Sequence, residues 1–431
     1  MNFDFLNKDR TPEERKKKAF IWNMAGSACN ASITFVLTLC VTRFCGVEQC
    51  GVFSIGFAIA QLMWTIGMFE EGTYQVTDAS NKLTFPQYTA FKILVCILMA
   101  VVSPFYALYM HMTLYKTYIA VLLCIFKLTD AASNLYFSLF QQHGRLDVSG
   151  FSMTVRNVVS MLVIALILLL TKSLALAIIV ASALSIVWIV VFEMGFAKTL
   201  TDIKPDFNPH AMSRLFFGCL PLFLSTFLIN YIYNIPKYGI EQFYDSTAQA
   251  YFNYVYSVAF IMNLFSLFAL KPLQTKLTEL WNTGKDEEFK YSVLKTSAAM
   301  GFISLAMAFL LAFLGPPILG WIYGVDLSIY HRSFFLVMIG GGISAVVNVL
   351  YNAITVMRLQ QFLLIGYGTS AVLSVILSKY LISQSGVHGA CWLFILSMAL
   401  ILAVFAVIFI LGYKHIKLNI WKMIFGDKWD N

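Results

Sequence analysis

Charged residues are scarce in this 431-residue chain: aspartate, glutamate, lysine and arginine together make up only 12% of it, about half the share in a typical soluble domain. Hydrophobic residues make up 59% and aromatic residues 16%, and the mean hydropathy is +0.75. The scarcity of charge excludes a soluble globular fold and predicts a polytopic integral membrane protein. The formal net charge of +8 does not indicate nucleic-acid binding, because the basic residues lie between apolar runs instead of on one soluble face.

Motifs that would hold a metal, a cofactor or a nucleotide are also missing. No C-x-x-C pair occurs and the cysteines form no cluster with histidine, so the sequence predicts neither a disulfide framework nor a metal site. It has no Walker A, H-E-x-x-H or G-x-S-x-G motif. We therefore expect no cofactor, no catalytic residue and no enzymatic activity. Any transport is expected to run on an ion gradient, the membrane potential or a substrate gradient.

The apolar runs predict twelve transmembrane helices, each close to the ~20 residues that cross a bilayer. The first is expected to begin at Thr11-Pro12-Glu13-Glu14, where threonine caps the helix, proline takes its first position and a glutamate closes a capping box. The predicted spans are Ala19–Phe44, Gly51–Met68, Gln87–Tyr109, Tyr115–Phe140, Met153–Leu170, Leu174–Phe196, Leu215–Tyr238, Ala248–Leu270, Ser292–Phe313, Ser333–Val356, Phe362–Leu381 and Val387–Leu411.

Lysine and arginine gather at alternate helix ends, which predicts that both termini are cytoplasmic. A weak repeat relates the two halves of the chain. The first span ends with Arg43–Glu48 and soon reaches Gly51–Ser54, and the seventh carries Lys237–Glu241 and then Ala250–Asn253. Because both halves begin in the cytoplasm, we expect two six-helix lobes related by a pseudo-two-fold axis along the membrane normal. The expected domains are an N-terminal lobe (1–200), a cytoplasmic linker (201–213), a C-terminal lobe (214–411) and a basic amphipathic cytoplasmic tail (412–431).

The seventh span carries an ionisable residue inside a hydrophobic helix. A charge at membrane depth is costly, so Lys237 indicates a wet cavity or a bundle interior. Pro236 removes a backbone donor beside it and favours a kink. Five polar residues share an arc of roughly 80°, and this face is predicted to line a central chamber for an anionic cargo. The alternative is that Lys237 reaches the outer interface. The face consists of Thr226, Asn230, Asn234, Lys237 and Glu241.

Three other spans carry polar stripes at helical spacing. Uncharged polar side chains also join helices by hydrogen bonds worth ~0.6 kcal/mol on average, but four stripes spread over both halves favour a hydrated interior. The three stripes are Asn23, Ser27, Asn30, Thr34 and Thr38 in the first span; Lys127, Asp130, Asn134, Ser138 and Gln141 in the fourth; and Ser344, Asn348, Asn352 and Thr355 in the tenth.

Two interpretations of the charged pair in the fourth span stay open. Lys127 and Asp130 are either a self-neutralising structural pair, or an ion-coupling pair in which Asp130 exchanges its partner for a proton or a sodium ion. Glu241 is placed in the same group. Arg43 lies away from the polar stripe of its helix and is interpreted as an interface anchor. The other charges near the spans are assigned no role: Glu70 and Glu71 are expected to be solvated, and Glu193, Arg156 and Arg358 lie near helix ends.

Around Asn234–Glu241, which reads N-I-P-K-Y-G-I-E, the chain resembles the polysaccharide and O-antigen flippases of the multidrug/oligosaccharidyl-lipid/polysaccharide exporter superfamily. An N-x-P-[KR]-Y-x-I segment is typical of the seventh span in that family. Three further stretches agree in order and spacing, so the resemblance covers nearly the whole chain. They are Arg43–Gly46 leading to Gly51–Phe53, Phe69–Tyr74 and Phe268–Trp281.

The resemblance implies a V-shaped pair of lobes that works by alternating access in the bacterial plasma membrane. The implied cargo is an undecaprenyl-diphosphate-linked oligosaccharide, turned from the inner to the outer leaflet. A glycan polymerase or biosynthesis complex and a coupling proton or sodium ion are implied partners. Lys237 maps onto the basic residues thought to bind the diphosphate, whereas relatives with deeper arginines in the first span differ from this chain. The substrate-binding candidates are Lys237, Asn234, Asn230, Asn23, Asn30, Ser27 and Arg43.

The chemistry of these residues fits the same task, because a lysine and hydrogen-bonding groups suit a phosphate and sugar hydroxyls. Alternatives stay open. A cation-coupled drug or metabolite antiporter of the same superfamily would need an aromatic, acidic cavity. An integral-membrane glycan polymerase or ligase usually displays charged residues in a sizeable outer loop, and the predicted outer loops are short. A scaffold subunit of an export complex would not need charges within the membrane.

Overall fold

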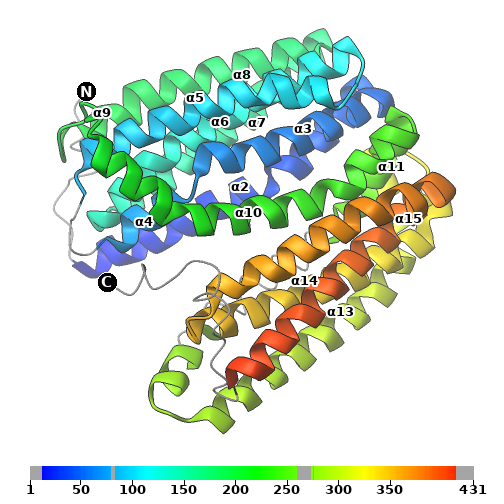
Figure 1. Cartoon of the computed structure of the whole chain (residues 1–431). Helices are drawn as coiled ribbons and strands as arrows, with labels where there is room; N and C mark the ends of the chain where they lie inside the picture. Colours follow the sequence, from blue (N-terminus) through cyan, green and yellow to red (C-terminus); the bar gives the residue numbers. More distant parts are fainter. Residues whose placement is uncertain (1–11, 79–82, 260–272, 275, 414–431) are drawn as a thin grey trace. The chain divides into compact units, whose positions relative to one another are not determined.

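The computed structural model describes residues 12–78, 83–259, 273–274 and 276–413, and all regular structure in these ranges is helical (Figure 1). The first described helix begins at Pro12, whose fixed φ suits the first helical position. The helices are α2 (Pro12–Cys45), α3 (Val47–Met68), α4 (Glu71–Thr77), α5 (Phe85–Tyr109), α6 (Leu114–Gln142), α7 (Leu146–Thr171), α8 (Leu174–Trp188), a π-helix (Ile189–Glu193), α9 (Met194–Ala197), α10 (Pro209–Phe243), α11 (Ser246–Tyr256), α13 (Asp286–Tyr323), α14 (His331–Val356) and α15 (Leu363–Tyr413).

The predicted all-helical membrane fold is confirmed. Ten segments of the described chain are long and apolar enough to cross a membrane. The last of them, Gln360–Tyr413, contains both the eleventh and the twelfth predicted spans. The eighth predicted span begins in α11 and continues into residues 260–272, which lie outside the described residues. The chain is therefore a multi-pass membrane protein.

The last two spans form a hairpin within α15. Its turn is at Gly386, with φ 52° and ψ −126°, a backbone conformation that residues with a side chain seldom adopt. On the facing sides of the two arms, the hydroxyl oxygens of Ser374 and Ser397 lie 2.6 Å apart. A Cβ atom on Gly389 would collide with the carbonyl group of Leu381, so the two arms meet backbone to backbone beside the turn.

The chain divides into two compact units. Unit 1 comprises Met1–Asn230 with Asp245–Ala250, and unit 2 comprises Tyr231–Tyr244 with Tyr251–Asn431. The division falls within α10 and within α11, so each of these helices contributes residues to both units. Residues 201–208, at the start of the predicted linker, are not helical, whereas α10 begins at Pro209. The predicted C-terminal tail lies outside the described residues from residue 414 onward.

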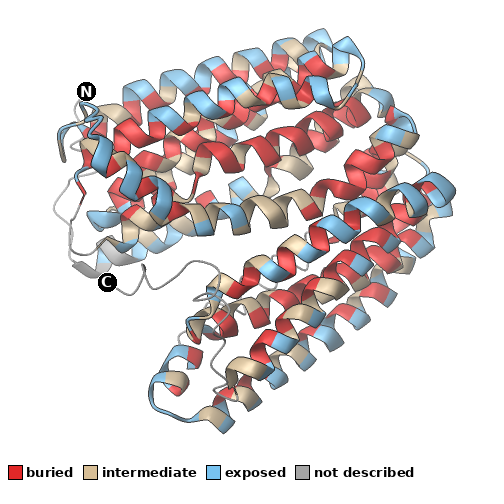
Figure 2. Cartoon of the chain, viewed as in Figure 1, coloured by how far each residue is buried: buried red, intermediate tan, exposed pale blue. Residues whose placement is uncertain are grey.

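Helix α3 is the central helix of unit 1. It is buried along nearly its whole length (Figure 2) and packs against α5 and α6. A hydrophobic core that includes Tyr88, Phe140, Phe196 and Leu215 joins α5, α6, α9 and the beginning of α10. In unit 2, α14 packs against both α13 and α15. The outward faces of α5, α7 and α13 expose large aliphatic and aromatic side chains, as expected of helices that contact lipid.

Glycine allows α2 and α7 to approach closely in unit 1. A Cβ atom on Gly26 would lie 2.7 Å from Met153 Cε and 2.9 Å from the carbonyl oxygen of Gly150. A Cβ atom on Gly150 would collide with the backbone of α2 at Trp22 and Asn23. Small residues at such a crossing let two backbones approach in a membrane, where packing is a main source of helix association. This crossing therefore depends on the absence of a side chain at position 150.

We predict that Gly150→Ala destabilises the protein by about 1–3 kcal/mol, because the added methyl group forces the two backbones apart. The measurement is thermal unfolding of the purified protein in detergent. Gly301→Ala is the matched control, since Gly301 lies within α13 and nothing is within 4 Å of its added Cβ atom. Removing a helical glycine there should leave stability unchanged or raise it by about 1 kcal/mol. Equal stability of the two variants would contradict the prediction.

Candidate functional site

The polar face predicted on α10 is divided between the two units. Asn234 and Lys237 are each 7% exposed, and Thr226, Asn230 and Glu241 are half-buried. In unit 1, Thr226 Oγ1 donates a hydrogen bond of 3.0 Å to Glu70 Oε1. The amide of Asn230 donates to the carbonyl oxygen of Thr226 at 2.9 Å. The N-terminal half of the predicted face is thus already hydrogen-bonded, and Lys237 belongs to unit 2.

Lys237 lies against an aromatic group within unit 2. Its Nζ atom is 5.5 Å from the ring centroid of Tyr256, a geometry that attracts a cation to the face of the ring. Tyr256 in turn packs on Phe394, with ring centroids 5.2 Å apart. Phe394 also contacts Tyr233, whose hydroxyl oxygen lies 2.8 Å from Ser344 Oγ. The ammonium group of Lys237 therefore lies inside unit 2, against an aromatic cluster.

The predicted ligands on the first span lie in unit 1 and are more exposed. Ser27, Asn30 and Arg43 are exposed, and Asn23 is half-buried. Arg43 lies in the last turn of α2, where a basic residue interacts favourably with the helix dipole. Farther along the same stripe, Thr38 is buried and donates to the carbonyl oxygen of Thr34 at 2.7 Å. The exposed residues of the stripe are thus Ser27 and Asn30.

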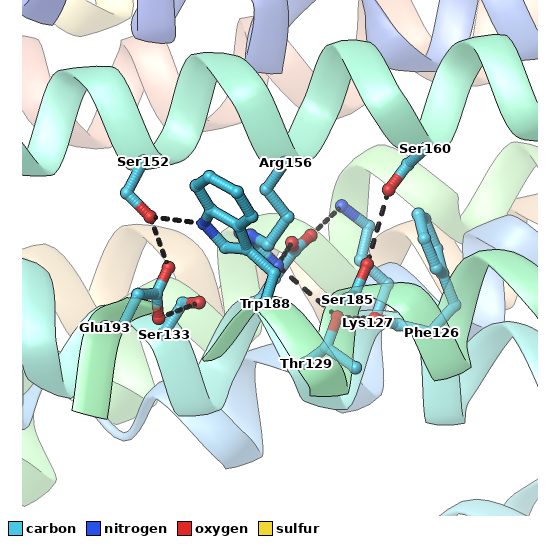
Figure 3. Close-up of polar contacts among 11 residues, drawn as sticks. Phe126, Lys127, Thr129, Ser133, Ser152, Arg156, Ser160, Ser185, Trp188 and Glu193 are labelled. Carbon is cyan, nitrogen blue, oxygen red and sulfur yellow. Dashed lines mark hydrogen bonds and ion pairs between the residues drawn. The ribbon is translucent and has the colours of Figure 1, made fainter. Parts of the chain in front are cut away.

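The charged pair of the fourth span belongs to a larger buried cluster (Figure 3). Lys127 Nζ lies 2.8 Å from Asp130 Oδ2, and Arg156 Nη1 lies 2.8 Å from Asp130 Oδ1. The side chains of these three residues are 11% exposed or less. Lys127 also lies over the rings of Phe57 and Trp64, 5.1 and 6.0 Å from their centroids. One carboxylate is thus shared by two cations that come from two different helices, α6 and α7.

A second buried carboxylate, Glu193, lies beside this cluster at the end of the π-helix. It accepts hydrogen bonds of 2.7 Å from Ser133 and from Ser152, one on each carboxylate oxygen. Ser152 also accepts a hydrogen bond of 2.8 Å from the indole nitrogen of Trp188. Figure 3 shows Ser152, Arg156 and Ser160 along one face of α7, directed at the helices that carry Ser133, Trp188 and Glu193. Polar groups from three spans therefore meet inside unit 1.

A third buried charge corrects a sequence-based expectation. Glu71 is fully buried rather than solvated, and its Oε1 atom lies 2.6 Å from Lys92 Nζ. Lys92 also donates to the carbonyl oxygen of Gly67 at 3.0 Å. The chain turns here through Phe69 and Glu70, which have positive φ values of 42° and 57°. This turn brings Glu71 inside the protein directly after α3.

Arg156, Glu193 and Lys92 were assigned no function from the sequence. The sequence does contain a pattern that indicates Arg156, since Ser152, Arg156 and Ser160 repeat at intervals of four and must share one face of a helix. Glu193 lies in a π-helix, whose register breaks the spacing on which such a search depends. The described residues contain no group of three or more histidine, cysteine, aspartate or glutamate side chains that could hold a metal ion.

Comparison with known proteins supports the fold and the resemblance noted above. No protein-family model matches the chain. The capsular polysaccharide biosynthesis protein CapF of Staphylococcus aureus is 21% identical over 271 residues, which are 62% of this chain and 68% of that protein. This relative is consistent with a polysaccharide flippase family.

Two solved structures with a similar fold are those of transporters. The lipid II flippase MurJ in an inward closed conformation has a TM-score of 0.67 and 16% identity, over 96% of this chain and 93% of that one. An inward-facing multidrug resistance MATE transporter of the MOP superfamily has a TM-score of 0.63 and 11% identity, over 89% of this chain and 94% of that one. At these identities the likeness establishes the fold.

We predict that Asp130→Asn destabilises the protein by about 3–5 kcal/mol, because the amide leaves Lys127 and Arg156 without their shared carboxylate in a buried site. Thermal unfolding in detergent measures the effect. Glu288→Gln is the matched control, since Glu288 lies 3.6 Å from Lys285 and both side chains are more than half exposed. An exposed pair of this kind contributes about 0–1 kcal/mol. A similar loss of stability in both variants would contradict the prediction that the buried cluster contributes more than an exposed ion pair.

Proposed function

We propose, starting from the MOP-superfamily fold that this chain has, that it is a flippase for undecaprenyl-diphosphate-linked oligosaccharide. It moves the repeat unit of a surface polysaccharide from the inner to the outer leaflet of a bacterial plasma membrane by alternating access, with both termini in the cytoplasm. The observation that carries the proposal is the ammonium group of Lys237, 7% exposed on the polar face of α10. The names of the two relatives, a capsular polysaccharide biosynthesis protein and a lipid II flippase, support it.

Lys237 has the chemistry to take the diphosphate. The ammonium group lies over the ring of Tyr256, a contact worth about 2 kcal/mol when it is desolvated. A diphosphate offers charged oxygen atoms, and charge-assisted hydrogen bonds are roughly twice as strong as neutral ones. Binding of the lipid headgroup therefore adds charge-assisted hydrogen bonds to the ammonium group of Lys237. Asn234, on the same face, contributes an amide beside it.

The remaining candidate ligands suit the sugars. Asn230 of α10 and the stripe of Asn23, Ser27 and Asn30 on α2 offer amide and hydroxyl groups, which match sugar hydroxyls. Arg43 acts as an anchor at the membrane interface. The polyprenyl chain remains in the bilayer throughout. A glycan polymerase that consumes the flipped lipid is the expected partner of the protein.

Lys127 and Asp130 are proposed to be structural in this scheme. Asp130 is held between Lys127 and Arg156 at 2.8 Å from each, so displacing one cation would leave a second one in place. Removing either partner of a buried ion pair is costly. A residue that binds and releases a coupling ion needs a smaller penalty for changing its charge.

The second candidate function is cation-coupled export of drugs or metabolites, since a MATE transporter has the same fold. Organic cations need carboxylates in the binding chamber, and Glu241 on the α10 face is one. We predict that cells lacking the protein lose surface glycan and retain their susceptibility to cationic drugs. Growth in the presence of such drugs and staining of the glycan measure the two effects. Drug hypersensitivity with normal glycan would favour the antiporter.

We predict that Lys237→Ala lowers export of the lipid-linked oligosaccharide about tenfold or more, since a lost hydrogen bond to a charged group is worth about 1.5–3 kcal/mol. Lys237→Glu should lower export further, because it places a carboxylate against the diphosphate. The measurement is the fraction of lipid-linked oligosaccharide accessible from outside the cell.

Lys295→Glu is the matched control for this experiment. Lys295 is an exposed lysine of unit 2 that also lies over an aromatic ring, 6.0 Å from the centroid of Tyr291. Its reversal of charge should leave export unchanged. Normal export by Lys237→Glu, in a protein that reaches the membrane in normal amount, would exclude the proposed phosphate contact.

A further inference from the structure

Glu193 differs from the other buried carboxylates of unit 1 in the partners that hold it. Asp130 lies within 2.8 Å of two cations, and Glu71 lies 2.6 Å from Lys92. Glu193 is 0% exposed, and each of its two oxygens is hydrogen-bonded to a hydroxyl group at 2.7 Å. An adjacent cation favours the charged form of a carboxyl group, whereas a hydroxyl can accompany either form.

The hydrogen-bond directions around Glu193 fix Oε1 as an acceptor and allow Oε2 to be either an acceptor or, once protonated, a donor. The indole nitrogen of Trp188 can only donate, so Ser152 accepts from it and directs its own hydroxyl hydrogen at Glu193 Oε1. Ser133 is bonded to Oε2, and its hydroxyl can rotate between donating and accepting. A proton added to Oε2 would therefore find an acceptor in Ser133 without any other group moving.

The π-helix creates this arrangement. Trp188 and Glu193 are five residues apart, so in an α-helix their side chains would point about 140° away from one another. In a π-helix each residue is hydrogen-bonded to the one five positions on, and Trp188 and Glu193 both reach Ser152. π-Helical turns are rare and occur frequently at functional sites. The π-helix thus allows the carboxyl group of Glu193 and the indole of Trp188 to hydrogen-bond to the same residue, Ser152.

We propose that Glu193 is a proton-binding site: its carboxylate takes up a proton from water on Oε2, and Ser133 then accepts a hydrogen bond from the new hydroxyl group. No covalent bond of the protein breaks, and the charge of the site rises by one. Its use as the coupling site for transport rests on the proposed function, whereas the binding of the proton does not.

The charged and titratable groups around Glu193 come from both helices packed against it. Asp130 and Tyr136 belong to α6 and interact with it electrostatically, as does Arg156 of α7. Together with Lys127, the cluster holds two cations and two carboxylates. Protonation of Glu193 leaves one positive charge in excess, spread over Lys127 and Arg156, which share Asp130 at 2.8 Å each. The proton thus makes this part of unit 1 more attractive to anions.

Infrared difference spectra of the purified full-length protein, recorded between neutral and acidic pH, test the site directly. We expect a carbonyl stretching band of a protonated carboxyl group that is absent from Glu193→Gln and present in Glu71→Gln. In Glu193→Gln the introduced amide retains both hydrogen bonds, with its oxygen accepting from Ser152 and its nitrogen donating to Ser133, so the variant should fold. A band that survives in Glu193→Gln, or that is lost in Glu71→Gln instead, overturns the proposal.

Two serine variants locate the proton. With the proton on Oε2, Oε1 is the carbonyl oxygen that Ser152 contacts, so Ser152→Ala should move the carbonyl band to higher frequency more than Ser133→Ala does. The opposite order overturns the assignment to Oε2. Sodium is tested at constant pH: a spectral change on adding sodium chloride that disappears in Glu193→Gln would replace the proton by a sodium ion and overturn the proposal.

Transport measurements separate the proton site from the proposed function. In vesicles, flipping of lipid-linked oligosaccharide should depend on pH in the native protein and should not in Glu193→Gln. Flipping by Glu193→Gln that keeps its pH dependence would overturn the coupling role. A protein that moves no lipid-linked oligosaccharide yet loses its infrared band on Glu193→Gln would overturn the proposed function and support the proton site.

Discussion

The electrostatic cost of charge away from water governs the organisation of this protein. A carboxylate or ammonium group in a medium of low dielectric constant needs a partner, because desolvation costs several kcal/mol per ion. Three buried charges of the described residues illustrate how this requirement is met. Asp130 is shared by two cations, Glu193 is held by two hydroxyl groups, and Lys237 lies over the ring of Tyr256. Each arrangement leaves a different free-energy penalty for changing the charge of the group, and the roles proposed for Asp130, Glu193 and Lys237 follow from this difference.

Much of the fold could be predicted from the sequence because the bilayer imposes one length and one composition on each span. The all-helical fold follows from apolar runs of the right length, and Pro12 marks the start of the first described helix. The tight hairpin at Gly386 was predicted only as two separate spans, since hydropathy cannot distinguish a short loop from a turn of one glycine. Helix α10 extends from Pro209 to Phe243, beyond both ends of its apolar run.

The polar clusters were harder to predict because they depend on contacts between helices. Lys127 and Asp130 are neighbours in sequence and were recognised as a pair, but Arg156, which shares the carboxylate, comes from another span. Glu193 reaches Ser133 and Ser152 from 60 and 41 residues away. Glu71 was expected in solvent because the backbone turn at Phe69 and Glu70, which requires positive φ in two residues with side chains, leaves no pattern in the sequence.

The hairpin in α15 has a consequence for how the protein reaches the membrane. Its arms are joined by a turn at Gly386, beside which the backbones touch, so almost no chain is available to remain in water between them. The backbone contact beside the turn can form only once both arms lie in the membrane, so a residue that weakens the second arm also removes packing from the first.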